Sequence, residues 1–195
     1  MKEEEILSHF RDTNALLEGH FLLSSGLHSD RYLQCAKVLM YPDRSAALCR
    51  ALCDKVNAAL GENAADIVVA PAMGGIIVGY ELARQLGVPS IFTEREDGVF
   101  TLRRGFELNP GARVIMSEDI VTTGKSSREC IDAIRAAGGN VVGATCLIDR
   151  SNGTADVGVP LISLMKMDVR TFDADNVPPE LAAVPAIKPG SRNLK

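Results

Sequence analysis

Two adjacent acidic residues followed by a run of hydroxyl and glycine residues form the group in this sequence with the clearest capacity for chemistry. The stretch is VIMSEDIVTTGKS, residues 114–126, in which Glu118 and Asp119 precede Thr-Thr-Gly-Lys-Ser. Carboxylates accept hydrogen bonds from hydroxyl groups, whereas hydroxyl side chains and the free backbone amides at the start of a helix bind phosphate. Gly124 allows the backbone to approach such a ligand closely. A ribose 5-phosphate, with vicinal hydroxyls at one end and a phosphate at the other, matches this order of groups.

The Gly-Lys-Ser that ends this stretch also ends the nucleotide-binding P-loop, whose pattern is GxxxxGK[ST]. In that pattern the first glycine would stand at position 119, where this sequence has Asp119. Because the carboxylate would point negative charge at a phosphate, the spacing excludes a P-loop NTPase. A plainer alternative is that Glu118 and Asp119 form a solvated turn and that Thr123 is an ordinary helix N-cap. The complete ordered string favours a ligand site.

The segments around this stretch alternate between strand-like and helical patterns. Short apolar runs, typical of buried parallel strands, occupy residues 66–70, 90–93, 113–117, 141–148 and 159–165. Helical periodicity that ends at glycine occupies residues 43–60, 74–86 and 123–137. This order predicts an α/β fold with a central, mostly parallel sheet flanked by helices. Because ligands of such sheets bind at the carboxyl ends of the strands, residues 118–126 are expected there.

Three segments lie outside this alternation. Residues 2–17 are spaced as a helix, and the LHSDRYLQ segment that follows alternates as an extended strand. Residues 94–110 alternate like the arm of a hairpin. The basic residues of that arm are Arg95, Arg103 and Arg104. The tail from Asp173 is rich in proline, which predicts irregular structure.

Composition restricts the class of protein further. With 195 residues, 46% of them apolar and 24% charged, the chain has the balance of one ordinary globular domain. A net charge of −4 argues against a nucleic-acid binder, and no apolar run approaches the roughly 18 residues of a membrane helix. The acidic start MKEEEILSHF lacks the pattern of a signal peptide, so we expect a cytoplasmic protein. Its five cysteines, without a CxxC pair, are expected to be buried, reduced and without a metal.

Five segments, in order along nearly the full chain, are similar to segments of one known family. Its phosphoribosyl pyrophosphate (PRPP) motif is similar to VIMSEDIVTTGKS, and its pyrophosphate loop is similar to DIVVAPAMGGI. Its N-terminal orotate-side segment resembles LLSSGLHSDRYLQ, its mobile catalytic loop resembles TEREDGVFTLRRGF, and its pyrimidine-binding arginine segment resembles CLIDRSNG. The chain therefore resembles the type I phosphoribosyltransferases. The order of all five segments points within them to the orotate phosphoribosyltransferases.

The sequence departs from the common pattern of that family at three places. Many bacterial members have Ala-Tyr-Lys-Gly in the pyrophosphate loop, where this chain has Ala-Met-Gly-Gly at residues 72–75. The catalytic loop is shorter here and carries arginine in place of lysine, and Ser24 stands where many members have lysine. These departures concern single contacts to pyrophosphate rather than the implied reaction.

The resemblance implies transfer of a phosphoribosyl group from PRPP to orotate, which gives orotidine 5'-phosphate and pyrophosphate in pyrimidine biosynthesis. It implies one domain over residues 1–195, with a small hood at about 1–40, a flexible hairpin loop at about 94–108 and the PRPP motif at 114–126. It also implies Mg²⁺ bound mainly through PRPP, without a direct protein ligand, and a homodimer in which the loop covers the neighbouring site. Two alternatives stay open: a purine phosphoribosyltransferase, and a PRPP-binding regulator without catalysis.

The resemblance also assigns roles to individual residues. The implied catalytic residues are Glu118, Asp119, Arg103 and Arg104. The implied contacts to PRPP are Arg95, Ala72, Met73, Gly74, Glu118, Asp119, Ile120, Val121, Thr122, Thr123, Gly124, Lys125 and Ser126. The implied contacts to orotate are Thr122, Arg150, Ser24 and Tyr32.

Several of these assignments have a structural alternative. The loop arginines would be solvated side chains of a plain hairpin, and Lys125 a solvated residue of the first helical turn. Arg150, which would select orotate over uracil through the carboxylate, would instead form a surface ion pair with Asp149. Tyr32 would pack in the core rather than against the pyrimidine. The family often has a non-proline cis peptide in the pyrophosphate loop, where the alternative is a plain strand-to-helix turn.

Overall fold

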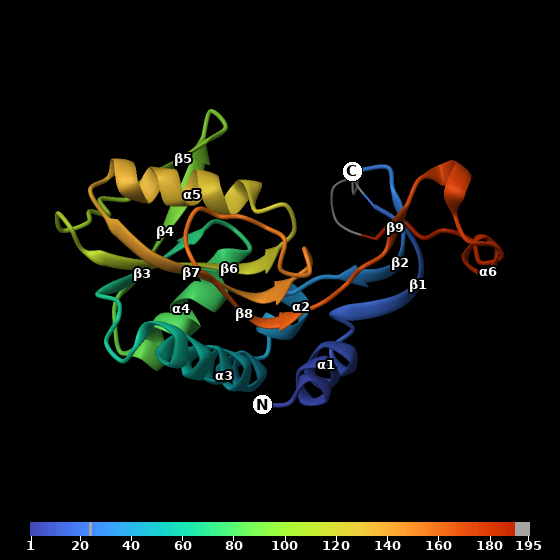
Figure 1. Cartoon of the computed structure of the whole chain (residues 1–195), viewed down its shortest axis with the longest axis horizontal. Helices are drawn as coiled ribbons and strands as arrows, with labels where there is room; N and C mark the ends of the chain where they lie inside the picture. The colour runs from blue at the N-terminus through green and yellow to red at the C-terminus, as the bar shows by residue number, and fades with distance from the viewer. Residues whose placement is uncertain (24, 190–195) are drawn as a thin grey trace.

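The centre of the molecule is a six-stranded sheet in the order β5-β4-β3-β6-β7-β8 (Figure 1). The structure, a computed structural model, describes residues 1–23 and 25–189. The strands of this sheet are β3 (Ile67–Pro71), β4 (Ser90–Glu96), β5 (Val99–Leu102), β6 (Arg113–Val121), β7 (Asn140–Asp149) and β8 (Leu161–Lys166). All neighbours run parallel except β4 and β5, which form a hairpin. The prediction of a central, mostly parallel sheet is confirmed.

Helices cover both faces of this sheet. One face carries α3 (Pro42–Leu60) and α4 (Gly75–Leu86), and the other carries α5 (Lys125–Ala136) (Figure 1). The sheet separates two hydrophobic cores, and successive side chains of β6 point alternately into one and the other. Ile115 packs in the core on the α3–α4 side, whereas Val114 and Met116 pack in the core on the α5 side. Burial on both faces explains why this part of β6 is apolar without interruption.

The N-terminal segment forms a separate three-stranded antiparallel sheet at one end of the molecule (Figure 1). Its strands are β1 (Leu16–Leu22), β2 (His28–Leu33) and β9 (Thr171–Phe172). The helix expected over residues 2–17 is wrong at its end: α1 spans Glu3–Asp12, and Asn14 with φ 53° breaks the helical conformation before β1. Strand β9 is not predictable locally, because its two residues become a strand only by pairing with β2.

Short helices complete the described chain. They are α2 (Ala36–Leu39), η1 (Ala174–Asn176) and α6 (Pro179–Ala182). Up to residue 189 the proline-rich tail otherwise has irregular structure apart from one isolated bridge, as its composition predicted. No helix in the described ranges is both long enough and apolar enough to cross a membrane.

Two strands that carry candidate residues are longer than predicted. Strand β4 runs through Glu96 and turns into β5 at Asp97 and Gly98, both with positive φ, which makes this part of the arginine-bearing segment a tight hairpin. Strand β6 runs through Val121, so the acidic pair lies within the strand instead of following it.

Candidate active site

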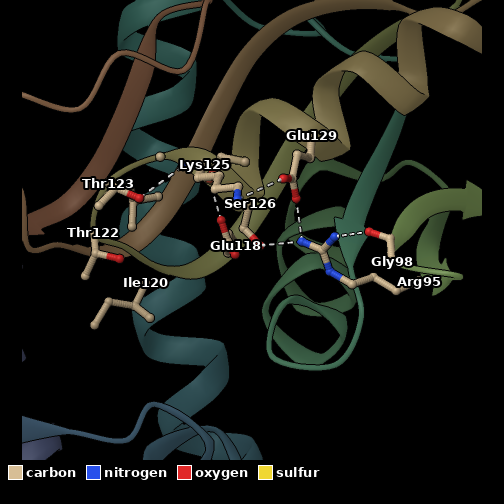
Figure 2. A pocket seen from close by; sticks show the side chains of 12 residues that line it. Arg95, Gly98, Glu118, Ile120, Thr122, Thr123, Lys125, Ser126 and Glu129 are labelled. Atoms are coloured by element: carbon tan, nitrogen blue, oxygen red, sulfur yellow. Dashed lines mark hydrogen bonds and ion pairs between the residues drawn. The ribbon is translucent and has the colours of Figure 1, made fainter. Parts of the chain in front are cut away.

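The carboxyl end of β6 borders a cleft of about 770 Å³ (Figure 2). Its walls are the end of β6, the turn into α5, the first turns of α5 and the β4–β5 hairpin. The lining residues are Arg95, Gly98, Glu118, Ile120, Val121, Thr122, Thr123, Gly124, Lys125, Ser126, Ser127 and Glu129. The predicted PRPP residues 120–126 thus lie together, at the strand ends where ligands of parallel sheets bind.

One end of the cleft is the N-terminus of α5. Gly124 precedes the helix with φ 74°, a conformation that favours glycine, and a Cβ built on it would lie 3.0 Å from Cγ1 of Val157. Thr122 and Thr123 are exposed on the turn, and the Lys125 amide donates a hydrogen bond of 3.4 Å to the Thr123 hydroxyl. Amides without an intrahelical partner and the helix dipole make this end suitable for a phosphate.

Glu118 lines the cleft from the α5 face of β6. Its Oε2 accepts a hydrogen bond of 2.5 Å from the hydroxyl of Ser127, a fully buried residue of α5. Burial raises the pKa of Glu118 to about 7, against the lowering effect of that hydrogen bond. Near neutral pH the group is therefore divided between a carboxylate, which only accepts hydrogen bonds, and a carboxylic acid, which also donates one.

Asp119 points to the opposite face of β6, because successive side chains of a strand alternate. Its Oδ1 accepts a hydrogen bond of 2.9 Å from the Ile120 amide, and burial raises the pKa of Asp119. The carboxylate lies against the loop that follows β3, since a Cβ built on Gly74 would lie 2.9 Å from Oδ1. The two acids are adjacent in sequence but face different sides of the sheet, and Asp119 does not line the cleft of Figure 2.

The loop of residues 72–74 joins β3 to α4 beside Asp119. The Ala72–Met73 peptide bond is cis, as the resemblance implied, and the Met73 side chain is exposed. At the start of α4, a Cβ built on Gly75 would lie 2.9 Å from the carbonyl oxygen of Ser117 in β6. Glycine at these positions therefore lets the loop lie close to β6, next to the buried carboxylate.

The three arginines of the hairpin segment have different positions. Arg95 lines the cleft, donates a hydrogen bond of 2.6 Å to the Gly98 carbonyl and forms a 2.5 Å ion pair with Glu129. Arg103 and Arg104 lie outside this cleft, and each forms an ion pair with a glutamate of β4. The structure therefore brings one predicted cation to the cleft and places the other two on the outer surface of the hairpin.

Arg150 follows β7 directly and is partly buried. Its backbone amide donates a hydrogen bond of 2.8 Å to the Val121 carbonyl, which holds it beside the turn into α5. Its Nε is buried without a hydrogen-bond partner among the described residues, and burial lowers the pKa of the guanidinium. The alternative of an ion pair with Asp149 is wrong, because the Asp149 carboxylate accepts its hydrogen bonds from Ser151 and Gly153. Arg150 is thus left with an unused donor, as expected of a ligand-binding arginine.

The remaining predicted contacts to orotate have mixed positions. Thr122 is exposed at the cleft. Tyr32 lies in the small sheet with its ring centroid 5.9 Å from that of Phe21, which supports its packing role. Ser24 lies outside the described residues, so its contact stays a prediction.

Sequence reasoning missed three residues that line the cleft: Gly98, Ser127 and Glu129. Ser127 orients the Glu118 carboxyl group, and Glu129 pairs with Arg95. The signal for Glu129 was its spacing: it follows Ser126 by three residues, which places both on one face of a helix. The signal for Ser127 was weaker, because a buried serine at this point resembles an ordinary packing residue.

The fold and the cleft together define a class: an α/β protein with a strand–turn–helix cleft whose helix N-terminus suits an anionic ligand. The sequence model of the phosphoribosyl transferase domain matches residues 40–182. The orotate phosphoribosyltransferase of Caulobacter vibrioides is 58% identical over the full length of both chains. That of Rhizorhabdus wittichii is 57% identical over 98% of this chain and 97% of the relative.

Solved structures agree with these sequence matches. The crystal structure of orotate phosphoribosyltransferase from Aeropyrum pernix superposes with a TM-score of 0.66 at 27% identity. The match covers 81% of this chain and 91% of that one. The chain therefore belongs to the phosphoribosyl transferase family, in which it groups with the orotate phosphoribosyltransferases.

Proposed function

We propose that this chain transfers the phosphoribosyl group of PRPP to orotate, forming orotidine 5'-phosphate and pyrophosphate in pyrimidine biosynthesis. The observation that carries the proposal is one cleft in which a helix N-terminus lies next to the Glu118 carboxyl group. This arrangement fits the phosphate and the hydroxyls of one ribose phosphate. Full-length relatives named orotate phosphoribosyltransferase support orotate as the acceptor.

In this proposal residues 122–126 bind the 5'-phosphate through amides and hydroxyls, Glu118 holds a ribose hydroxyl from inside the cleft, and Asp119 is assigned the other from the opposite face of β6. When the bond from the anomeric carbon to pyrophosphate breaks, the leaving group takes the electron pair and the sugar gains positive charge. Orotate N1 then forms the new bond to that carbon and gives up its proton to water. Carboxylates beside the sugar and cations beside the leaving group stabilise the separated charges, so catalysis is mainly electrostatic.

The proposed contacts to pyrophosphate come from two sides. Arg95 is already at the cleft, and on the other side the loop of residues 72–74 comes close to Asp119 at Gly74. The Ala72 amide of that loop, however, is occupied by a hydrogen bond of 2.8 Å to the Thr93 carbonyl. The planar fork of an arginine suits phosphate oxygens. Arg103 and Arg104 lie on the outside of the hairpin, so they reach pyrophosphate only if the hairpin moves or belongs to a neighbouring copy. We therefore propose a homodimer in which the hairpin covers the neighbouring site and excludes water.

Arg150 is proposed to bind the acceptor, orotate, at the end of the site beside Val121 and Thr122. It binds the carboxylate of orotate, a group that uracil lacks. Its support is the unused Nε donor and the backbone bond to Val121, which places it next to Thr122. Thr122 contributes a hydroxyl group between the acceptor and the phosphate turn. A carboxylate there would accept a charge-assisted hydrogen bond, among the stronger kinds in proteins.

Mg²⁺ is proposed to arrive with PRPP, whose phosphate oxygens it prefers as ligands. The donor set of the chain fits this, because the cleft carboxyl groups of Glu118 and Glu129 are engaged by Ser127 and Arg95. Among the described residues, moreover, no group of three or more histidine, cysteine or acidic side chains is arranged to hold a metal ion. The ion supplies positive charge to the leaving group. All five cysteines are buried free thiols, which supports a reducing, cytoplasmic location.

The test is to mix protein, Mg²⁺, PRPP and orotate and to follow the loss of the ultraviolet absorbance of orotate. We expect turnover that requires PRPP. Turnover with hypoxanthine or xanthine but not with orotate would contradict the proposal and assign a purine acceptor. Binding of PRPP without turnover of any base would indicate a regulator instead.

A further inference from the structure

Glu129 brings a second acidic side chain into the cleft, in addition to Glu118, and it lies next to the proposed phosphate contacts. Its Oε2 lies 2.5 Å from Nη2 of Arg95, and its Oε1 lies 3.9 Å from Nζ of Lys125. Arg95 and Lys125 are the basic residues that line the cleft. Figure 2 shows the Glu129 carboxylate between these two cationic groups. The carboxylate thus occupies the position relative to both cations that an oxygen of a bound phosphate would take.

Arg95 is held in place by contacts that do not involve Glu129. Its Nη1 donates to the Gly98 carbonyl at 2.6 Å, and its guanidinium carbon lies 4.0 Å from the ring centroid of Phe100. Its Nη2 also lies 3.5 Å from the Ser126 hydroxyl. The guanidinium therefore keeps its position when its anionic partner changes. The hydrogen bond from Arg95 lowers the pKa of Glu129, which keeps the competing carboxylate ionised at neutral pH.

We propose that Glu129 is an internal counter-ion that determines which anions this cleft accepts. The inference rests on the proposed PRPP site. An anion of low charge would have to displace the Glu129 carboxylate from Arg95 and Lys125. Its own contacts to these two cations would be similar in strength, so its net binding free energy would be small. A pyrophosphate group offers more charge and more oxygens than it displaces. Glu129 therefore lowers the affinity of the cleft for simple anions and reserves Arg95 and Lys125 for a polyanion.

The test is the affinity for inorganic phosphate and for inorganic pyrophosphate with Mg²⁺, measured by calorimetry. Glu129→Gln keeps the length of the side chain and removes its charge. An exposed ion pair such as Arg95–Glu129 changes an equilibrium constant by about 1.4- to 5-fold. Removing the repulsion between the Glu129 carboxylate and the bound anion increases this factor further. We expect Glu129→Gln to lower the dissociation constant for phosphate about 3- to 10-fold and the one for pyrophosphate by a smaller factor, and an equal gain for both anions would refute a role in selecting between them. Unchanged or weaker binding of both anions would overturn the inference.

Asp132 provides the matched control. It lies on α5, outside the cleft, with a side chain that is 75% exposed and 3.8 Å from Arg135. Asp132→Asn removes the same charge from the same helix, and we expect both dissociation constants to change by less than about 1.5-fold. If Asp132→Asn gives the same gain as Glu129→Gln, the effect is one of net charge and the inference is wrong. Glu129→Ala must also tighten binding, which guards against a folding defect of one variant.

A double variant separates this inference from the proposed site. If Glu129 acts through Arg95, the gain from Glu129→Gln should fall below about twofold in an Arg95→Gln background. An equal gain in both backgrounds would contradict the counter-ion role. If Arg95→Gln alone leaves pyrophosphate binding unchanged, the placement of pyrophosphate at Arg95 is wrong, and the inference falls with it. If Arg95→Gln weakens binding and Glu129→Gln brings no gain, only the counter-ion role is wrong.

Discussion

Glu118→Gln should make the ligand-free protein more stable at alkaline pH, although it alters a proposed catalytic residue. The carboxyl group of Glu118 is buried, and burial raises its pKa from 4.5 to about 7. Glutamine has nearly the same shape, and its carbonyl oxygen accepts the same hydrogen bond from Ser127. The substitution therefore removes the cost of a buried charge and changes little else.

The size of the effect follows from the two pKa values. A difference of about 2.5 units, at about 1.36 kcal/mol each, makes ionisation of Glu118 cost the folded state about 3 kcal/mol. The folded state holds this proton more tightly than the unfolded chain. The stabilisation is therefore present in full below pH 4.5 and is lost between about pH 4.5 and 7. The variant has no such loss, so its advantage over the wild type should grow by about 3 kcal/mol across this range.

The assay is urea unfolding of wild type and Glu118→Gln at pH 5 and pH 8.5, with the free energies extrapolated to water. Glu129→Gln is an internal control, because both assay pH values lie above the ordinary pKa of Glu129, and its difference from wild type should be nearly the same at pH 5 and pH 8.5. The hydrogen bond from Arg95 lowers the pKa of Glu129, so its contribution is present above the unfolded pKa and lost as the pH falls through the folded one. An equal difference between Glu118→Gln and wild type at both pH values would refute the idea that the cleft desolvates Glu118.

Three further substitutions test the site in steady-state kinetics. Arg150→Ala should raise the KM for orotate about 10- to 100-fold, the range for a lost hydrogen bond to a charged group, and the KM for PRPP less than about twofold. Equal effects on both substrates would remove Arg150 from the acceptor end. Asp119→Asn should lower kcat/KM for PRPP about tenfold or more, and wild-type kinetics would exclude Asp119 from the ribose contacts. Gly74→Ala places a Cβ 2.9 Å from Oδ1 of Asp119 and should lower kcat/KM for PRPP about tenfold without a large change in melting temperature. An unaltered rate would show that this close approach has no role in catalysis.

The acidic residues Glu118 and Asp119 show which features of the site short sequence segments predict and which they do not. Their types and their place before Thr-Thr-Gly predicted a ribose site, and the structure puts the following turn at a cleft. The prediction that Glu118 and Asp119 follow the strand is wrong, because β6 continues in register with β7 as far as Val121. Pairing with a strand that comes later in the chain decides this length, and alternation then sends the two carboxyl groups to opposite faces.

The hairpin arginines show the same limit. Their number and spacing predicted a basic arm, and β4 and β5 form that arm. Which arginine faces the cleft depends on where the hairpin packs against α5, which no periodicity within residues 94–108 records. Arg95 reaches Glu129, 34 positions away, whereas Arg104 stays with Glu94 in its own hairpin.

The sequence by itself determined the α/β fold and the position of the turn of residues 122–124, because apolar runs, glycine helix ends and Gly124 are signals contained in short segments. Only the tertiary structure decided which charged groups meet. It set Glu129 against Arg95, brought Asp119 to the loop after β3, and left Arg150 without a carboxylate partner among the described residues. These contacts join segments far apart in the chain, and their energies depend on burial and distance, which exist only once the segments have packed.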